Sequence, residues 1–322
     1  MHPKGKPLKG VALVVAATLL FACADTLGKH LALLYPVTLV LAARYTVNLG
    51  LVAAVMTPRH RAALWRTHRT GLVILRGACL ALASISMMAA LRLMPVAETV
   101  AIIYIAPVLV MLAAGTLLKE QVGALGWISA GLGFAGVLLI ARPGSGLDPL
   151  GVALSLVNAC LSTGYHLLTR ALSKTETTMA LMFHTALVGA VIFVSLTLAL
   201  GSETMPSPLD AGLMLTLGAL ATVGHLLFTS AYREAPASTL APVNYMHIAF
   251  ATLLGWLVFQ HLPDVLGFAG MGLIAAAGLL AAWRASRLPD VAAEPGLPNP
   301  FTFAQISPRG AHAEPFCVLH TK

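Results

Sequence analysis

Charged residues are scarce in this chain of 322 residues. They make up only 10% of it, whereas hydrophobic residues make up 58%. Soluble domains carry about 25% charged and roughly 45–50% apolar residues. This composition excludes a water-soluble domain as the main body of the chain, and it predicts an integral membrane protein.

The sequence also lacks the short motifs of common enzyme and metal sites. It contains no Gly-x-x-x-x-Gly-Lys-Ser/Thr phosphate loop, no Gly-x-Ser-x-Gly elbow and no His-Glu-x-x-His zinc motif. The four cysteines, Cys23, Cys79, Cys160 and Cys317, show no metal-ligand spacing, and we interpret them as free thiols. We therefore expect no catalytic residue, no metal and no cofactor.

Long apolar runs dominate what is present. A run of about 20 residues crosses roughly 30 Å of hydrocarbon as a helix, whereas strands of a barrel alternate over about ten residues. We predict an all-α integral membrane protein with ten transmembrane helices. The predicted spans are residues 11–29, 36–57, 70–91, 96–118, 122–141, 149–170, 178–200, 209–231, 237–260 and 264–283. A short amino-terminal segment, 1–10, precedes them, and we expect a disordered cytoplasmic tail over 285–322.

The sequence repeats itself at a constant offset of 141 residues. The segment LRLMPVAETVAIIYIAPVLVMLAAGTLL at 91–118 is matched by YREAPASTLAPVNYMHIAFATLLGWLVF at 232–259. In this register Tyr104 falls on Tyr245 without a gap. The chain therefore contains an internal duplication that extends across most of its length.

The duplication predicts two five-helix repeats, 11–143 and 149–284. Because each repeat has an odd number of spans, the second repeat is inverted in the membrane relative to the first. Inverted repeats are typical of secondary transporters, which bind their cargo near the midplane between the repeats.

Lys and Arg residues in the loops predict the orientation. One side of the membrane holds Lys4, Lys6, Lys9, Arg59, Arg61, Arg66, Arg69, Lys119, Arg170, Lys174, Arg233, Arg284 and Arg287, and the other holds Lys29, Arg92 and Arg142. The richer side is expected to be cytoplasmic, with both termini on it. The formal net charge of +8 is then mainly a topology signal, and we expect no nucleic-acid partner.

Together with GWISAGLGFAGVLLIARPG at 126–144, the duplicated segments resemble the two EamA domains of the drug/metabolite transporter superfamily. The resemblance covers about residues 10–284. It implies a carrier of the bacterial inner membrane that has ten helices and no ATPase motor. Relatives export amino acids, and others move riboflavin or S-adenosylmethionine. The first repeat ends its fourth helix with Lys119-Glu120, whereas the second has Gln260-His261, so the resemblance implies no symmetric role for Glu120.

Four polar residues near the middle of the fourth and ninth spans are candidates for substrate binding. Tyr104 and Tyr245 each lie about 12 Å deep, from opposite membrane faces, at 1.5 Å per helical residue. Asn244 and His247 share a helix face near Tyr245. We interpret the four as a cargo site; the alternative is interhelical hydrogen bonding, commonly worth about 0.6–2 kcal/mol.

Two histidines inside spans, and a tyrosine beside one of them, are further candidates, because imidazole titrates near neutral pH. His166, with Tyr165 beside it, is predicted to contact cargo or carry a proton, and His225 is predicted to take part in coupling or gating. The alternative for each histidine is a structural hydrogen bond between helices.

Four ionisable residues within spans are candidates for coupling or gating, because a charge in hydrocarbon must pair or line a cavity. For Asp25 and Arg44, which lie in the outer halves of neighbouring spans, the alternative is a structural ion pair. For Glu98, the alternative is a favourable interaction of its carboxylate with the positive end of its helix dipole. Arg76 alternatively extends to the lipid headgroups.

We therefore hypothesise a secondary carrier that exports amino acids or their derivatives, with protons as coupling ion. The alternative is uptake or exchange of a metabolite such as riboflavin or S-adenosylmethionine. A non-transporting membrane enzyme or receptor is the alternative of another class. Expected partners are a small-molecule substrate and the lipid bilayer; the sequence does not indicate the oligomeric state.

The orientation gives a first prediction. Single cysteines introduced at 59–69 and in the tail should react with a membrane-impermeant maleimide only after the inner membrane is opened. A cysteine at 143–148 should react in intact spheroplasts, and variants without the native cysteines provide the background. Opposite accessibility of 59–69 and the tail would contradict the inverted arrangement.

Overall fold

The computed structural model describes residues 7–117, 124–142, 145–172, 175–201, 205–234, 240 and 243–287. All regular elements in these ranges are helices. Six of them are long and apolar enough to cross a membrane, and shorter apolar segments cover 96–110, 124–140, 246–259 and 265–280. The all-α prediction with ten transmembrane helices is confirmed.

The helices follow the order of the predicted spans. Those of the first repeat are α1 (Pro7–Leu34), α2 (Val37–Trp65), α3 (Thr70–Leu93), α4 (Val96–Ile103), α5 (Ala106–Leu117) and α6 (Ala124–Ile140). Those of the second are α7 (Pro149–Leu172), α8 (Thr178–Leu200), α9 (Pro208–Glu234), α11 (Met246–Phe259) and α12 (Val265–Arg287). Several boundaries differ from expectation: α1 (Pro7–Leu34) begins within the predicted 1–10 segment and is longer than the predicted 11–29 span, α2 extends into the predicted 59–69 loop, and the fourth span is divided into α4 and α5.

Parts of the predicted chain lie outside the described residues. These are the tail from 288 onward, with Cys317, and the Lys119-Glu120 pair. The first residues of the predicted tail, 285–287, belong to α12. The cysteines at 23, 79 and 160 are free thiols, as expected.

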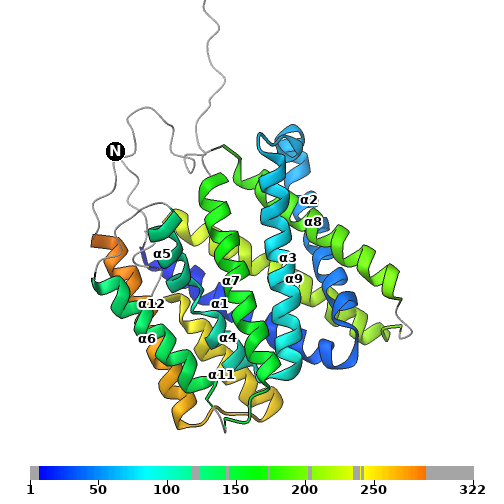
Figure 1. Ribbon diagram of the computed structural model, residues 1–322. Helices are drawn as coiled ribbons and strands as arrows, with labels where there is room; N and C mark the ends of the chain where they lie inside the picture. Colours follow the sequence, from blue (N-terminus) through cyan, green and yellow to red (C-terminus); the bar gives the residue numbers. More distant parts are fainter. Residues whose placement is uncertain are drawn as a thin grey trace, which may run out of the picture.

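The main helix contacts join the two repeats (Figure 1). Helix α1 packs on α9, and α3 packs on α7, which is the same contact under exchange of the repeats. Helices α2 and α8 pack on each other, as do α6 and α12. The largest buried apolar cluster joins α4, α5 and α6 of the first repeat to α7, α11 and α12 of the second, with Ile102 and Ile274 fully buried in it. The core therefore forms between the repeats.

Contacts between loops define two ends of the bundle. The outer end, at the bottom of Figure 1, holds the α1–α2, α3–α4, α6–α7, α8–α9 and α11–α12 connections. There Tyr35 Oη donates to Asp210 Oδ2 at 2.7 Å, and Arg142 forms an ion pair with Asp264. The inner end holds the α2–α3 and α7–α8 connections. These two names follow the predicted orientation and are used below.

Small residues allow α6 and α12 to approach closely. A side chain on Gly136 would lie 2.7 Å from the carbonyl oxygen of Gly270, and a side chain on Gly270 would lie 2.7 Å from that of Gly136. Two turns away on each helix, Ser129 Oγ donates to the carbonyl oxygen of Ala277 at 2.6 Å. This is the small-residue packing that holds helices together in lipid, where hydrophobic attraction between them is weak.

The crossing predicts that Gly136→Leu destabilises the fold. Overpacking commonly costs about 1–3 kcal/mol, and here the clash is with backbone. We expect a lower midpoint of thermal unfolding and less monodisperse protein in detergent. Gly131→Leu is the control, because Gly131 is exposed on the same helix and nothing lies within 4 Å of an added side chain. Equal behaviour of the two variants would contradict the packing.

Candidate functional site

Two helices are interrupted at the duplicated tyrosines. Helix α4 ends at Ile103 and α5 begins at Ala106, so Tyr104 lies in the break. Pro107 has no N–H, and its ring crowds the preceding turn, which explains why the helix cannot continue regularly here. In the second repeat α11 begins at Met246, directly after Tyr245. The two breaks therefore occupy equivalent positions of the repeats.

The breaks bring four predicted residues together. The rings of Tyr104 and Tyr245 have centroids 5.4 Å apart. Tyr104 Oη donates to the carbonyl oxygen of Asn244 at 3.0 Å and lies 3.2 Å from Nδ1 of His247. Since Tyr104 belongs to the first repeat and the other residues to the second, this cluster connects the two repeats.

Asp25 of α1 joins the cluster through the buried imidazole of His247. His247 Nε2 lies 3.1 Å from Asp25 Oδ2, and both side chains are largely buried. The predicted alternative, an ion pair between Asp25 and Arg44, is wrong. Residue 25 lies on the side of α1 that faces α11, so its carboxylate contacts His247.

One aromatic ring connects this cluster to a second imidazole. Phe21 lies one turn before Asp25 on α1. Its ring centroid is 6.1 Å from that of His247 and 4.9 Å from that of His225 on α9. Phe21 was not a predicted site residue, because a phenylalanine in an apolar span carries no signal of function.

His225 is exposed on the protein-facing side of its helix. Met214, Gly218 and Ala221 share its face of α9 at earlier turns, and all three are buried. The same is true of His166 on α7, which is exposed although Ser155 and Ala159 on its face are buried. Both imidazoles are therefore exposed on helix faces that are buried at earlier turns, in the inner half of the bundle.

Arg76 is buried among neutral groups. Only 4% of it is exposed, so the predicted alternative, extension to lipid headgroups, is wrong. Its Nε donates to Thr169 Oγ1 at 2.7 Å, and one terminal nitrogen donates to Tyr165 Oη at 2.7 Å. The other terminal nitrogen donates to Thr185 Oγ1 and to the carbonyl oxygen of Leu181. Tyr165 thus holds Arg76 and does not join the tyrosine cluster.

Glu98 lies at the outer end, in the first turn of α4 as expected for a dipole interaction. It is also buried and paired, since its Oε1 lies 2.8 Å from Nε2 of His261. Lys29 of α1 lies nearby, with Nζ 5.2 Å from the Phe259 ring centroid and bonded to the carbonyl oxygen of Met94.

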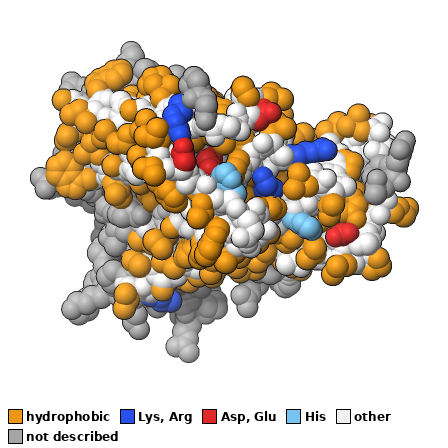
Figure 2. Space-filling view, turned by 90° about the horizontal axis from the view of Figure 1, so that it is seen from below, with side chains coloured by type: hydrophobic (Ala, Val, Ile, Leu, Met, Phe, Trp, Pro, Cys, Tyr) orange, Lys and Arg blue, Asp and Glu red, His pale blue; other side chains and the backbone are white. Residues whose placement is uncertain are grey.

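Lys29 and His261 line a cavity of about 100 Å³ at this end. Figure 2 views the same end and shows charged and histidine side chains in a band across a mostly apolar surface. The contacts of this band, together with the Arg142–Asp264 pair, connect the two repeats at the outer end.

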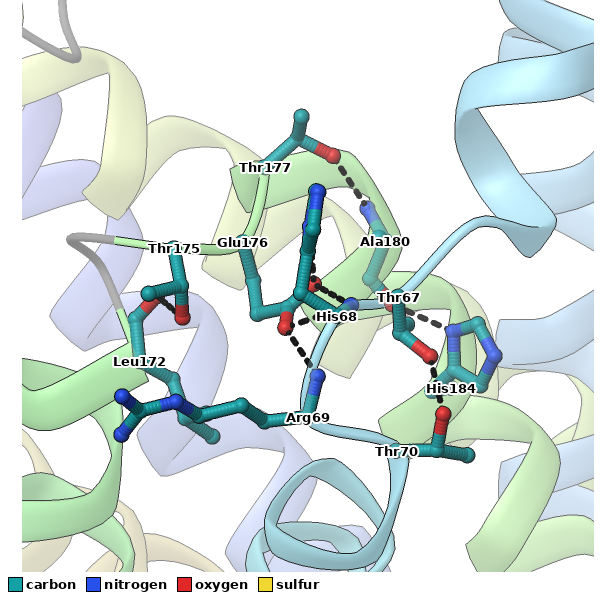
Figure 3. A network of polar contacts seen from close by, with 10 residues as sticks. All are labelled: Thr67, His68, Arg69, Thr70, Leu172, Thr175, Glu176, Thr177, Ala180 and His184. Atoms are coloured by element: carbon teal, nitrogen blue, oxygen red, sulfur yellow. Dashed lines mark hydrogen bonds and ion pairs between the residues drawn. The ribbon is translucent and has the colours of Figure 1, made fainter.

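At the inner end a buried carboxylate joins the repeats through the backbone (Figure 3). Glu176, in the α7–α8 connection, accepts hydrogen bonds from the N–H groups of His68 and Arg69 at 2.7–3.1 Å. These groups precede α3, whose first N–H groups have no partner within the helix. Lys9 and Glu234 add an ion pair at 2.5 Å. The sequence contains no signal for Glu176, because nothing local marks it as buried.

Comparison with known proteins assigns the family. The sequence profile of the EamA-like transporter family matches residues 8–142 and again 149–283. A riboflavin transporter of Rhizobium johnstonii is 29% identical over 67% of this chain and 72% of its own length. A pseudopaline exporter of Pseudomonas aeruginosa is 25% identical over 83% of this chain and 94% of its own.

A solved crystal structure shares the fold. It covers 88% of this chain and 98% of its own, with a TM-score of 0.61 and 19% identity. With the bacterial relatives and the apolar spans, the family match makes this a multi-pass protein of the bacterial inner membrane that transports a small molecule.

Removing the hydroxyl groups of the two tyrosines is predicted to have unequal effects on the free energy of unfolding. Tyr104→Phe should lower the free energy of unfolding by about 1–2 kcal/mol, because the Asn244 carbonyl and His247 lose a partner. Tyr245→Phe is the matched control, since its buried hydroxyl has no hydrogen-bond partner among the described residues. Thermal unfolding in detergent would measure both. Equal losses would contradict the assigned contacts.

Proposed function

This chain belongs to the EamA-like transporter family, and we propose that it exports amino acids or their derivatives by alternating access, with cargo bound at the central cluster. The observation that carries the proposal is the meeting of Tyr104 and Tyr245, on interrupted helices of opposite repeats. Transporters of the inverted-repeat plan place their substrate sites at interrupted helices near the midplane.

The cluster has the groups that an amino acid needs. The tyrosine rings and Phe21 provide aromatic surface for a side chain, and Asp25 provides a carboxylate for an ammonium group. Backbone groups at the helix breaks are also proposed to contact the cargo, since residues there leave the regular helix. Asn244 and His247 are proposed to hydrogen-bond the cargo.

Proton coupling is proposed to occur at Asp25 and His247. Tyr104 has a single hydroxyl hydrogen, which it donates to the Asn244 carbonyl. Nδ1 of His247 must then donate to the phenol oxygen, while Nε2 faces the carboxylate of Asp25. A doubly protonated ring satisfies both contacts, and a neutral ring satisfies only one. Loss of the proton therefore weakens the contact between α1 and α11.

Glu98 is proposed to act in gating. Its pair with His261, like the pair between Arg142 and Asp264, connects the repeats at the outer end. Release of cargo to that side requires these contacts to separate. At the inner end, Lys9–Glu234 and the Glu176 contacts have the equivalent position.

A second carrier function is uptake or exchange of a vitamin or nucleoside-type metabolite. It is favoured by relatives named riboflavin transporters, one of which, from Vibrio cholerae, is 25% identical over 82% of this chain. S-adenosylmethionine belongs to the same alternative. A membrane enzyme or receptor would instead convert or bind a compound without moving it.

Counterflow in proteoliposomes tests the proposal. Vesicles loaded with unlabelled amino acids should accumulate the labelled compound, and riboflavin should not drive this uptake. Asp25→Asn should lower accumulation driven by a proton gradient about tenfold or more, since a charge-assisted contact is worth about 1.5–3 kcal/mol, and should also weaken exchange, because the same carboxylate is proposed to bind the ammonium group. Arg92→Gln, at an exposed outer position, is the control. Counterflow with riboflavin alone would favour the second function, and no transport under any gradient would contradict both.

A further inference from the structure

The positive charge of Arg76 has no acidic partner in the part of the chain that the structure describes. Its hydrogen bonds go to two threonine hydroxyls, a tyrosine hydroxyl and a carbonyl oxygen, and its guanidinium carbon lies 4.3 Å from the centroid of the Tyr165 ring. Among the described residues these contacts engage four of the five N–H groups, and they do not neutralise the charge. A buried cation within a membrane protein normally pairs or faces a water-filled space.

Arg44 adds a second positive charge to the same region. It is half-buried on α2, where its carbonyl oxygen lies 3.1 Å from the position of a side chain added to Gly218 of α9, two turns before His225. Arg76 stacks on the ring of Tyr165, whose centroid is 5.3 Å from that of His166. Two arginines from neighbouring helices therefore lie near the helices that carry the two exposed imidazoles.

The acidic residues of the described spans are engaged elsewhere. Asp25 pairs with His247, and Glu98 pairs with His261 at the outer end. Asp210 accepts from Tyr35, and Glu234 pairs with Lys9. The interior of the bundle around Arg44, Arg76, His166 and His225 consequently has an excess of positive charge among the described residues. We call these four residues the cationic lining.

The two imidazoles of the cationic lining are exposed, and His225 adjoins the proposed cargo site. His225 and His166 are exposed on faces of α9 and α7 that are buried at earlier turns. Phe21 stands between His225 and His247, with ring centroids 4.9 Å and 6.1 Å away. The tyrosine cluster and the cationic lining are thus separated by one aromatic ring, that of Phe21. A small molecule bound at the cluster would extend past this ring to reach His225.

We propose that the cationic lining binds an anionic group of the cargo, a carboxylate or a phosphate, with Arg44 and His225 as the contacting residues and Arg76 as a fixed source of positive potential. This inference rests on the proposed transport function and narrows its substrate class. Cargo must carry a negative charge at one end, while Asp25 at the other end of the site favours a positive one. Zwitterions such as amino acids satisfy both requirements, and simple amines satisfy only one.

Matched ligand pairs test this inference on the purified protein in detergent. Isothermal titration calorimetry would compare L-phenylalanine with L-phenylalaninamide, L-histidine with histamine, and flavin mononucleotide with riboflavin. The anionic member of a pair that binds should bind about tenfold to a hundredfold more tightly, as expected for hydrogen bonds to a charged group of about 1.5–3 kcal/mol.

Variants connect the preference to the residues. Arg44→Gln and His225→Gln should reduce the preference to less than about threefold, and Arg44→Lys should keep part of it, because it preserves the charge but not the planar geometry of the guanidinium. Arg92→Gln removes the same charge at an exposed outer position and should keep the preference fully. Thermal unfolding of each variant shows that it is folded.

The outcomes separate this inference from the proposed function. If compounds are transported and both members of a pair bind equally, the anionic site is overturned and transport stands. If the preference persists in Arg44→Gln and His225→Gln, the site is also overturned. If no pair binds and no counterflow occurs, the proposed function and this inference fail together.

Discussion

Polar groups in hydrocarbon must find partners inside the protein, and in this molecule they find them mainly across the two repeats. Tyr104 of one repeat bonds to Asn244 and His247 of the other, and Asp25 contacts the same imidazole. The helix packing follows the same rule, since α1 lies on α9 and α3 on α7. Contacts within a repeat also occur, as between Tyr45 and Ser84, but the central site needs residues of both repeats.

Much of this arrangement follows from the sequence, because its signals are local or periodic. The apolar runs determine the number of helices, and the constant offset relates Tyr104 to Tyr245. Pro107 marked the helix break beside Tyr104, although the span was predicted as continuous. The partners of charged residues were harder to predict. Which side of α1 faces α11 depends on the rotation of packed helices, so the contact of Asp25 with His247 instead of Arg44 had no sequence signal.

The charges are distributed unevenly along the direction of transport. The outer end has opposite charges in contact, as in Glu98–His261 and Arg142–Asp264. Away from that end, Arg44 and Arg76 have no acidic partners among the described residues. A positive field of this kind attracts anions into the bundle and disfavours cations.

The contact of Glu176 differs from the others because it is made to main-chain N–H groups. The side chains at 68 and 69 take little part in it: that of His68 is 80% exposed, and its Nδ1 lies 3.9 Å from Glu176 Oε2. Nearly every amino acid at these two positions is therefore compatible with the main-chain hydrogen bonds to Glu176. Proline is the exception, since it has no hydrogen on its nitrogen to donate.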